Sequence, residues 1–237
     1  MATHLGRAGY KSVKADFNLG SYGEGFWVKK YYMETISFSE NNIFPSEKNM
    51  VAETIRFIRR HDSVSKQPLF IHFKTKTPHY PYNYPNDETL TFDETSSPSK
   101  NYKIGMEYVD VQLGKLYDFL HERERDRKTV IIVVGDHANY LDKSLATALP
   151  VDDVLWTGAI VSGSEALVGK PRIKNVHCSQ IDIMPTILYL SGDTSPRVTL
   201  GRNLLDDDFD ETEAFSIAVR PSGVRIDKGG FTYIVDR

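Results

Sequence analysis

The stretch TVIIVVGDHANYL, from Thr129 to Leu141, indicates the fold of this chain, because an unbroken apolar run ends in Gly-Asp-His. The run over residues 129–134 predicts a strand that is buried on both faces. Neighbouring side chains of a strand point to opposite faces, so Asp136 and His137 reach one site only where the backbone has left the sheet, a turn that Gly135 permits. A carboxylate beside an imidazole is a partial ligand set for a divalent metal ion. The alternative is an Asp that caps a helix, next to a surface His.

The size and composition of the chain bound its class. It has 237 residues, enough for one large α/β domain or two small ones. A net charge of −3 provides no basic field, so a nucleic-acid partner is not expected. No apolar run is long enough to span a membrane, and the first residues do not form a signal peptide. The single cysteine, Cys178, excludes an internal disulfide, and the oligomeric state does not follow from the sequence.

Helix and strand patterns alternate on both sides of the opening stretch. Apolar residues recur at helical spacing over residues 48–61, 102–124 and 179–192, and Gly192 is expected to close the last helix. Short apolar runs predict further strands over residues 69–75 and 154–162, and three β-like runs follow over residues 213–219, 223–226 and 231–235. This order predicts an α/β fold of three α/β/α layers, with a mostly parallel sheet and a small C-terminal antiparallel sheet.

A second polar stretch, KTKTPHYPYNYP, leaves the predicted strand over residues 69–75. Ligands bind beyond the carboxyl ends of the strands in open α/β sheets, so His79 is expected at the same edge as Asp136 and His137. Imidazole at this place could bind an anionic group or protonate a leaving oxygen. The alternative is a loop of proline and tyrosine with an incidental histidine.

Four motifs, taken in order, resemble the sulfatase branch of the alkaline phosphatase superfamily, which includes arylsulfatases and lipoteichoic acid synthase-like phosphotransferases. The motifs are PLFIHFKTKTPHYPY from Pro68, the segment from Tyr108 that ends in VVGDHA, VHCSQIDIMPTILYLSG from Val176, and LGRNLL from Leu200. The resemblance implies an alkaline phosphatase-like fold in one partial sulfatase-like domain, residues 1–237. Its α/β core would span residues 1–205, and a C-terminal β subdomain would span residues 206–237.

The resemblance also implies roles for individual residues. Asp136 and His137 match the metal-ligand pair of the family, which implies a divalent metal cofactor, with Mn²⁺ or Zn²⁺ favoured over Ca²⁺. His79 matches the catalytic histidine that contacts the sulfate or phosphate ester. The segment GEGFWVKKYY resembles a segment of the lipoteichoic acid synthases, so Trp27 and Lys29 are expected on the substrate side.

Lys143 lies a few residues past the metal pair, where it could reach an anionic ester, with a plain surface lysine as the alternative. The implied partner is a sulfate- or phosphate-ester substrate. Family members usually act in the periplasm or outside the cell, although nothing within these residues directs export.

The nucleophile of the family and its first acidic metal ligand are expected upstream of residues 5–10, where this chain starts. We therefore expect the C-terminal part of a metal-dependent sulfatase-like hydrolase or phosphotransferase, without its own nucleophile. His137 and the segment around Trp27 favour the phosphotransferase side. The alternative is a non-catalytic, truncated sulfatase-fold binding protein, which Ala138 favours because it replaces the glycine that usually follows Asp-His. A third hypothesis is a doubly wound binding domain in which the Asp-His pair is incidental.

Overall fold

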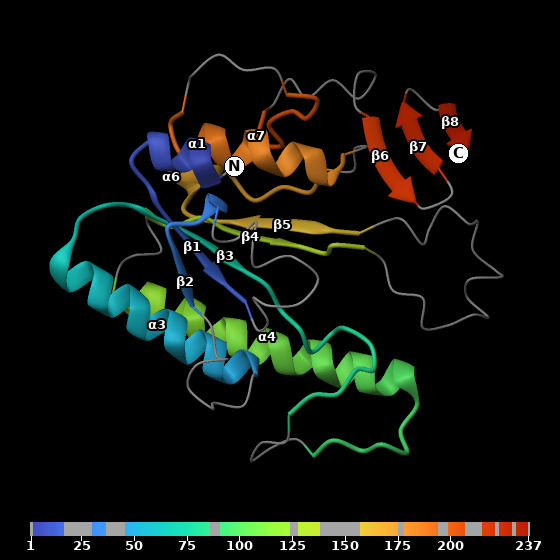
Figure 1. Ribbon diagram of the computed structural model, residues 1–237, viewed down its shortest axis with the longest axis horizontal. Helices are drawn as coiled ribbons and strands as arrows, with labels where there is room; N and C mark the ends of the chain where they lie inside the picture. Colours follow the sequence, from blue (N-terminus) through green and yellow to red (C-terminus); the bar gives the residue numbers. More distant parts are fainter. Residues whose placement is uncertain are drawn as a thin grey trace. The chain divides into compact units, whose positions relative to one another are not determined.

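The computed structural model describes residues 2–16, 30–36, 46–85, 91–123, 128–137, 157–174, 178–193, 199–206, 215–220, 223–228 and 231–236. These residues belong to two compact units, residues 2–126 and residues 127–237, and each unit is described by itself (Figure 1). The boundary expected at residue 205 stays a prediction.

The unit over residues 2–126 is built on a parallel three-stranded sheet, called sheet A. β1 (Lys11–Ala15) is its central strand and lies between β2 (Glu34–Ile36) and β3 (Leu69–Phe73). A short helix, α1 (Ala2–Arg7), leads into β1. Because β1 and β3 are parallel and in register to their last residues, the segments that follow them leave the same edge of the sheet.

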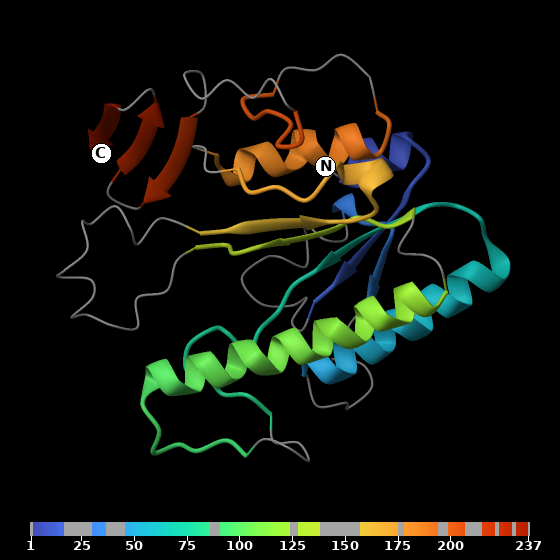
Figure 2. The ribbon, with the colours of Figure 1, turned by 180° about the vertical axis from the view of Figure 1, so that it is seen from behind.

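Two long helices cover one face of sheet A and run side by side (Figure 2). α3 (Glu47–Val64) begins after Ser46, and α4 (Pro98–Glu122) begins after Ser97. The hydroxyl of each serine accepts a hydrogen bond of 3.3 Å from a backbone N–H of the first helical turn. Both predicted helices are confirmed. α4 starts already at Pro98, because proline needs no hydrogen-bond partner in the first turn of a helix.

The core of this unit lies between sheet A and the two helices. Val13 and Ala15 of β1 are fully buried. Each large apolar side chain that is removed from water contributes about 1.5–3 kcal/mol, so these contacts dominate the stability of the unit. The buried apolar residues of α3 are Met50, Val51, Phe57 and Ile58, and those of α4 are Tyr108, Val109, Phe119 and Leu120.

In the unit over residues 127–237, β4 (Ile131–Val134) pairs antiparallel with β5 (Ala159–Ser162). The predicted burial of this strand on both faces is wrong for this structure, because Val133 is 45% and Val134 is 40% exposed. Among the described residues β4 has β5 as its one hydrogen-bonded neighbour. An apolar run identifies a strand, but the burial of that strand depends on neighbours that are remote in the sequence.

α7 (Ile183–Leu190) lies along the β4–β5 pair (Figures 1 and 2) and continues a 3₁₀ turn, Gln180–Asp182. It ends at Gly192, whose φ of 73° lies in the left-handed region. The N–H of Gly192 donates to the carbonyl oxygen of Tyr189 at 3.0 Å, and that of Asp193 donates to Leu188 at 3.1 Å. This pair of hydrogen bonds is a Schellman motif, so the predicted helix end is confirmed. A further short helix, α6 (Glu165–Val168), follows β5.

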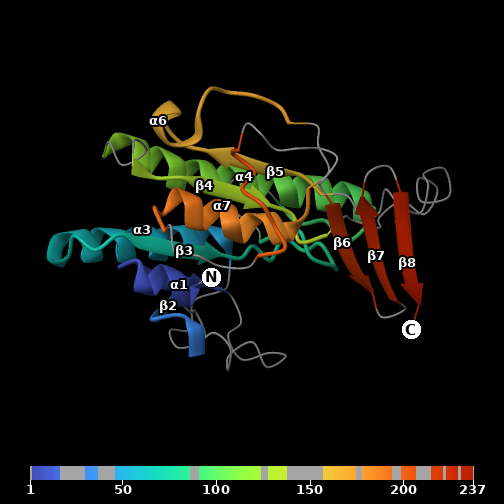
Figure 3. The same cartoon turned by 90° about the horizontal axis from the view of Figure 1, so that it is seen from above.

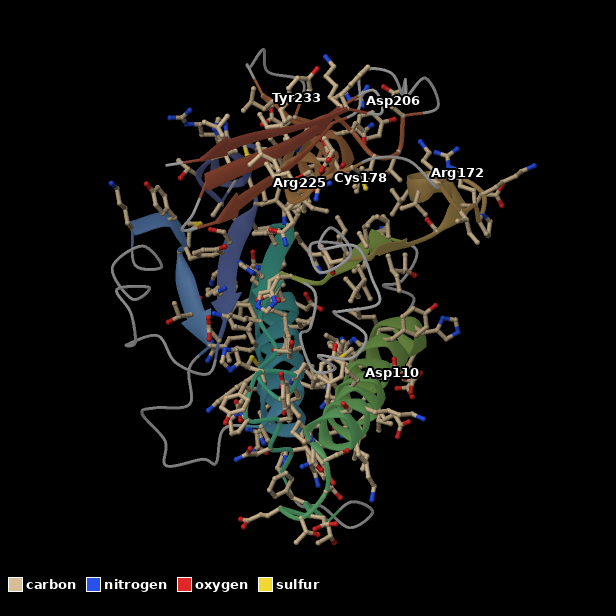
Figure 4. The ribbon with its side chains drawn as sticks, turned by 90° about the vertical axis from the view of Figure 1, so that its right-hand side faces the viewer. Asp110, Arg172, Cys178, Asp206, Arg225 and Tyr233 are labelled. Carbon is tan, nitrogen blue, oxygen red and sulfur yellow. The ribbon has the colours of Figure 1, made fainter. Side chains whose placement is uncertain are left out.

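The end of the chain forms an antiparallel meander, β6 (Phe215–Arg220), β7 (Gly223–Lys228) and β8 (Phe231–Asp236), as predicted (Figure 3). Arg225 and Tyr233 lie on neighbouring strands of this sheet (Figure 4). Helices, a parallel sheet and small antiparallel sheets together place the chain in the α/β class, as expected. Within the described ranges, we find no helix that is long and apolar enough to cross a membrane.

Candidate functional site

Asp136 and His137 follow β4 directly and are accessible to solvent. The side chain of Asp136 is 84% exposed and that of His137 is 63% exposed, and Asp136 Oδ2 lies 3.7 Å from His137 Nε2. The other carboxylate oxygen of Asp136 accepts a hydrogen bond of 3.0 Å from the backbone N–H of His137. The backbone has therefore left the pleat, and both side chains reach one place.

Gly135 precedes this pair and is required for space. Its φ is not in the left-handed region, but a Cβ built on Gly135 would overlap Oγ1 of Thr157, the residue two positions before β5. The N–H of Gly135 also donates to the carbonyl oxygen of Gly158 at 3.4 Å. The prediction that this glycine serves the turn is therefore refined, because close packing against the segment that leads into β5 is what excludes a side chain.

Gln180, in the turn before α7, holds the backbone of the Asp-His segment. Its side-chain nitrogen donates to the carbonyl oxygens of Gly135 at 2.9 Å and Asp136 at 2.7 Å. A primary amide carries two hydrogens and can serve both acceptors at once. The helix that starts here therefore orients the segment from which the two candidate ligands project.

Asp182 makes that helix start rigid. It is buried, and its Oδ2 accepts from the N–H of Ser179 at 2.7 Å, in a capping box with the Ser179 hydroxyl. Its Oδ1 accepts from the N–H of Arg202 at 2.7 Å, and this hydrogen bond links the helix start to the LGRNLL motif. Gly201 packs so closely that a Cβ there would overlap the carbonyl oxygen of Ile181. The DIMPT and LGRNLL motifs therefore pack against each other and hold the start of this helix.

The Asp136–His137 pair can hold a divalent cation by its donor chemistry and spacing. Carboxylate oxygens and imidazole nitrogens bind Zn²⁺ at about 2.0–2.2 Å, so two donors on one ion are at most about 4.3 Å apart. The observed 3.7 Å falls within this limit. In the parts of the chain that the structure describes, no cluster of three or more His, Cys, Asp or Glu side chains surrounds the pair. The pair thus fits as a part of a ligand set.

His79 lies on the segment that leaves the carboxyl end of β3. Residues 76–82 form two consecutive turns, in which the N–H of His79 donates to Lys76 O at 2.9 Å and the N–H of Tyr82 donates to His79 O at 2.8 Å. Nδ1 of His79 lies 2.6 Å from the carbonyl oxygen of Tyr80. A carbonyl oxygen only accepts, so we assign the proton to Nδ1, which leaves the lone pair of the neutral ring on Nε2. The imidazole is exposed.

A polar cluster within sheet A was not predicted from the sequence. Lys14 is buried on β1, and its Nζ lies 3.5 Å from Asp16 Oδ2 and 3.3 Å from both ring nitrogens of His72, its partner on β3. The hydroxyl of Tyr32 lies 2.7 Å from His72 Nδ1, and burial raises the pKa of Tyr32, so this hydroxyl remains protonated. Asp16 leaves the same edge of sheet A as the His79 segment.

The structure describes three of the six predicted site residues. Asp136 and His137 lie together at the end of β4, whereas Trp27, Lys29 and Lys143 lie outside the described residues. His79 belongs to the other compact unit, so its meeting with the Asp-His pair stays a prediction.

Sequence reasoning missed several supporting residues. Lys14 and Asp16 could have been noticed, because polar residues at alternate positions of KSVKAD share one face of a strand. Gln180 gave no local signal, because its hydrogen-bond partner Asp136 is remote in the sequence. The same holds for Glu47, whose carboxylate accepts a hydrogen bond from the backbone N–H of Thr77.

Comparisons with known proteins show the family and the fold of the chain. A family model described as Sulfatase matches residues 1–192. A lipoteichoic acid synthase of Staphylococcus saprophyticus is 28% identical over 221 residues, which cover 85% of this chain and 33% of that protein. Lipoteichoic acid synthase 1 of Bacillus subtilis is 26% identical over 160 residues, 63% of this chain and 25% of that protein. The chain thus spans about a third or less of the length of these relatives.

Solved structures share the fold. A protein of the alkaline phosphatase superfamily from Vibrio parahaemolyticus superposes with a TM-score of 0.79 at 18% identity, over 99% of this chain and 57% of that chain. A lipoteichoic acid synthase from Listeria monocytogenes superposes with a TM-score of 0.65 at 20% identity, over 85% of this chain and 55% of that chain. At these identities the likeness shows an alkaline phosphatase-like fold.

Proposed function

Because the chain belongs to the sulfatase family, we propose that it takes part in the cleavage or transfer of a phosphate or sulfate ester with a divalent cation. Asp136 and His137 would hold the cation, with Mn²⁺ or Zn²⁺ favoured over Ca²⁺. The observation that carries this proposal is the exposed pair at the end of β4, where a carboxylate oxygen and an imidazole nitrogen lie 3.7 Å apart. A divalent cation bound there supplies Lewis-acid polarisation of the ester.

A phosphate ester is the favoured substrate class. The relatives reported above are named lipoteichoic acid synthases, and the histidine of the Asp-His pair favours the phosphotransferase side. In this proposal Trp27, Lys29 and Lys143 contribute to the substrate side of the site. Two lysines and an aromatic ring suit an anionic group attached to an organic alcohol.

His79 is proposed to contact the oxygens of the ester through Nε2. Its Nδ1 proton is engaged by Tyr80 O, so the ring presents Nε2 outward. The neutral ring accepts a proton there, and the protonated ring donates a hydrogen bond to an anionic or leaving oxygen.

Calorimetry with MnCl₂, ZnCl₂ and CaCl₂ tests the cation site. The chain should bind Mn²⁺ or Zn²⁺, and both Asp136→Ala and His137→Ala should abolish that binding. Asp110→Ala and His121→Ala are matched controls, because both side chains are exposed on α4. Figure 4 shows Asp110 on this helix. Cation binding that persists in both site variants would overturn the assignment of these ligands.

A non-catalytic, sulfatase-fold binding protein is the second candidate, and Ala138 favours it because it replaces the usual glycine after Asp-His. The two candidates differ in turnover. Because the chain is expected to lack its own nucleophile, the catalytic proposal expects slow, cation-dependent hydrolysis of the probe bis(p-nitrophenyl) phosphate with water as the attacking group, lost in Asp136→Ala. Binding of the cation and of inorganic phosphate without any turnover of this probe would favour the binding protein.

A further inference from the structure

Glu47 is a fully buried acidic residue that the proposed chemistry does not use. It is the first residue of α3, and its exposed fraction is 0%. A carboxylate is favoured at a helix N-terminus, where backbone N–H groups point outward. A buried charge nevertheless needs several hydrogen-bond partners to offset the loss of its hydration. The identity of those partners therefore shows what this carboxylate holds in place.

Three donors from one short turn satisfy the Glu47 carboxylate. Oε1 accepts from the backbone N–H of Lys76 and from that of Thr77, each at 2.8 Å. Oε2 accepts from the Thr77 hydroxyl at 2.5 Å. Hydrogen bonds to an ionised acceptor are stronger than those between neutral groups. These three come from two adjacent residues and converge on one carboxylate. Glu47 is thus a clamp on the turn at residues 76–77.

α4 packs against the same turn. A Cβ built on Gly105 would lie 3.2 Å from Thr77 Cγ2, so this helix packs directly on the Thr77 side chain. The aromatic rings of Tyr82 and Tyr102 meet edge to face, with centroids 5.7 Å apart, further along the segment. The segment after β3 is therefore held between the start of α3 and the first half of α4.

The clamped turn determines where His79 lies. Pro78 separates His79 from Thr77 and fixes its own φ, so little backbone freedom remains between the clamp and the histidine. The N–H of His79 donates back to Lys76 O at 2.9 Å, within the clamped turn. The orientation of the ring then allows its Nδ1 to reach Tyr80 O at 2.6 Å.

We infer that Glu47 is a positioning residue for His79: its carboxylate holds the turn at residues 76–77, and that turn keeps the imidazole in the Nδ1–H tautomer with Nε2 directed to an ester. This inference rests on the proposed function for the use of Nε2. The hold of Glu47 on the turn that precedes His79 does not depend on that function.

Imidazole NMR of the 237-residue chain tests the inference without cation or substrate, at alkaline pH where the ring is neutral. The wild type should show the ¹⁵N pattern of a single Nδ1–H tautomer for His79. Glu47→Ala and Thr77→Val should lose this single pattern and show both tautomers. Glu47→Gln should retain it, because the amide oxygen still accepts from both backbone N–H groups and the amide nitrogen can donate to the Thr77 hydroxyl, so that all three contacts are kept. Glu53→Ala is the matched control on the same helix and should leave the pattern unchanged.

The outcome that overturns the inference is an unchanged His79 pattern in Thr77→Val and in Glu47→Ala. If Glu47→Ala fails to fold, Thr77→Val decides, because it keeps the shape of the side chain and removes only the hydroxyl. Titration with inorganic phosphate separates this inference from the proposed function. A His79 signal that shows one tautomer but does not respond to phosphate contradicts the ester contact and leaves the clamp intact.

Discussion

Gln180 donates from its side-chain amide to the carbonyl oxygen of Asp136 at 2.7 Å, and the same nitrogen lies 2.9 Å from the carbonyl oxygen of Gly135. The start of α7 therefore holds the backbone behind the proposed cation ligands. Glu47 plays a comparable part for His79, with a charged acceptor in place of a neutral donor. In both cases an exposed candidate site residue, of the Asp136–His137 pair or His79, follows a backbone segment that a side chain from another element holds in place.

Gln180→Ala should weaken Mn²⁺ or Zn²⁺ binding at Asp136 and His137 by about 10–100-fold, as loss of an outer-shell partner does in metal sites. Gln180→Glu should be at least as harmful, because a carboxylate would face two carbonyl oxygens. Calorimetry measures both affinities. Gln67→Ala is the control, because the Gln67 amide donates in the same way to Gly9 O, at 2.9 Å, in the other unit. Equal affinities in Gln180→Ala and Gln67→Ala would contradict the role of Gln180.

Gly135→Ala should destabilise the unit over residues 127–237 by about 1–3 kcal/mol, because its Cβ overlaps the Thr157 hydroxyl and the packed region must shift. Thr157→Ala removes the overlapping atom. The double variant should therefore recover most of the loss, which urea unfolding of the four proteins in the cycle measures. If the two substitutions prove additive, the overlap is not the reason for glycine at this position.

Gly201→Ala should be more harmful than Gly135→Ala, because the overlapping atoms belong to the backbone of Ile181 and Asp182 and cannot rotate away. The hydrogen bond from Arg202 N–H to Asp182 should be lost as well, and this amide should exchange faster with solvent. Gly114→Ala is the matched control. A Cβ at Gly114 meets nothing within 4 Å, so alanine there should stabilise α4 by about 0.5–1 kcal/mol. Similar effects at both glycines would refute the packing argument.

Asp93, just before α4, should titrate at an unusually acidic pH. Hydrogen bonds from the hydroxyls of Thr95 and Ser96 and from the Thr95 N–H lower its pKa from 3.8 to about 2. A lowered pKa stabilises the folded state above pH 3.8, and this contribution is lost as the pH falls through about 2. Carboxyl ¹³C NMR should show the midpoint rising back toward 3.8 in Thr95→Ala. A midpoint that does not move in this variant would show that the hydroxyl is not the cause.

Local patterns predicted the individual elements well. The helices over residues 48–61 and 102–124 were recognised from apolar spacing. The buried positions of α4 nevertheless include a polar residue, Gln112. β2 was missed, because it has only three residues and follows a segment rich in glycine and aromatic residues. Such a short strand is stabilised by its pairing with β1 rather than by its own pattern.

The sequence by itself determined the α/β class, the helix end at Gly192, the C-terminal meander and the presence of an Asp-His pair after a strand. Each of these follows from interactions over a few residues: apolar periodicity, capping, and the conformational freedom of glycine. Only the tertiary structure decided that Gln180 reaches Asp136 and that Glu47 reaches Thr77. Contacts between residues 30 or 44 positions apart depend on how whole elements pack, and a buried glutamate looks the same in the sequence as a solvated one.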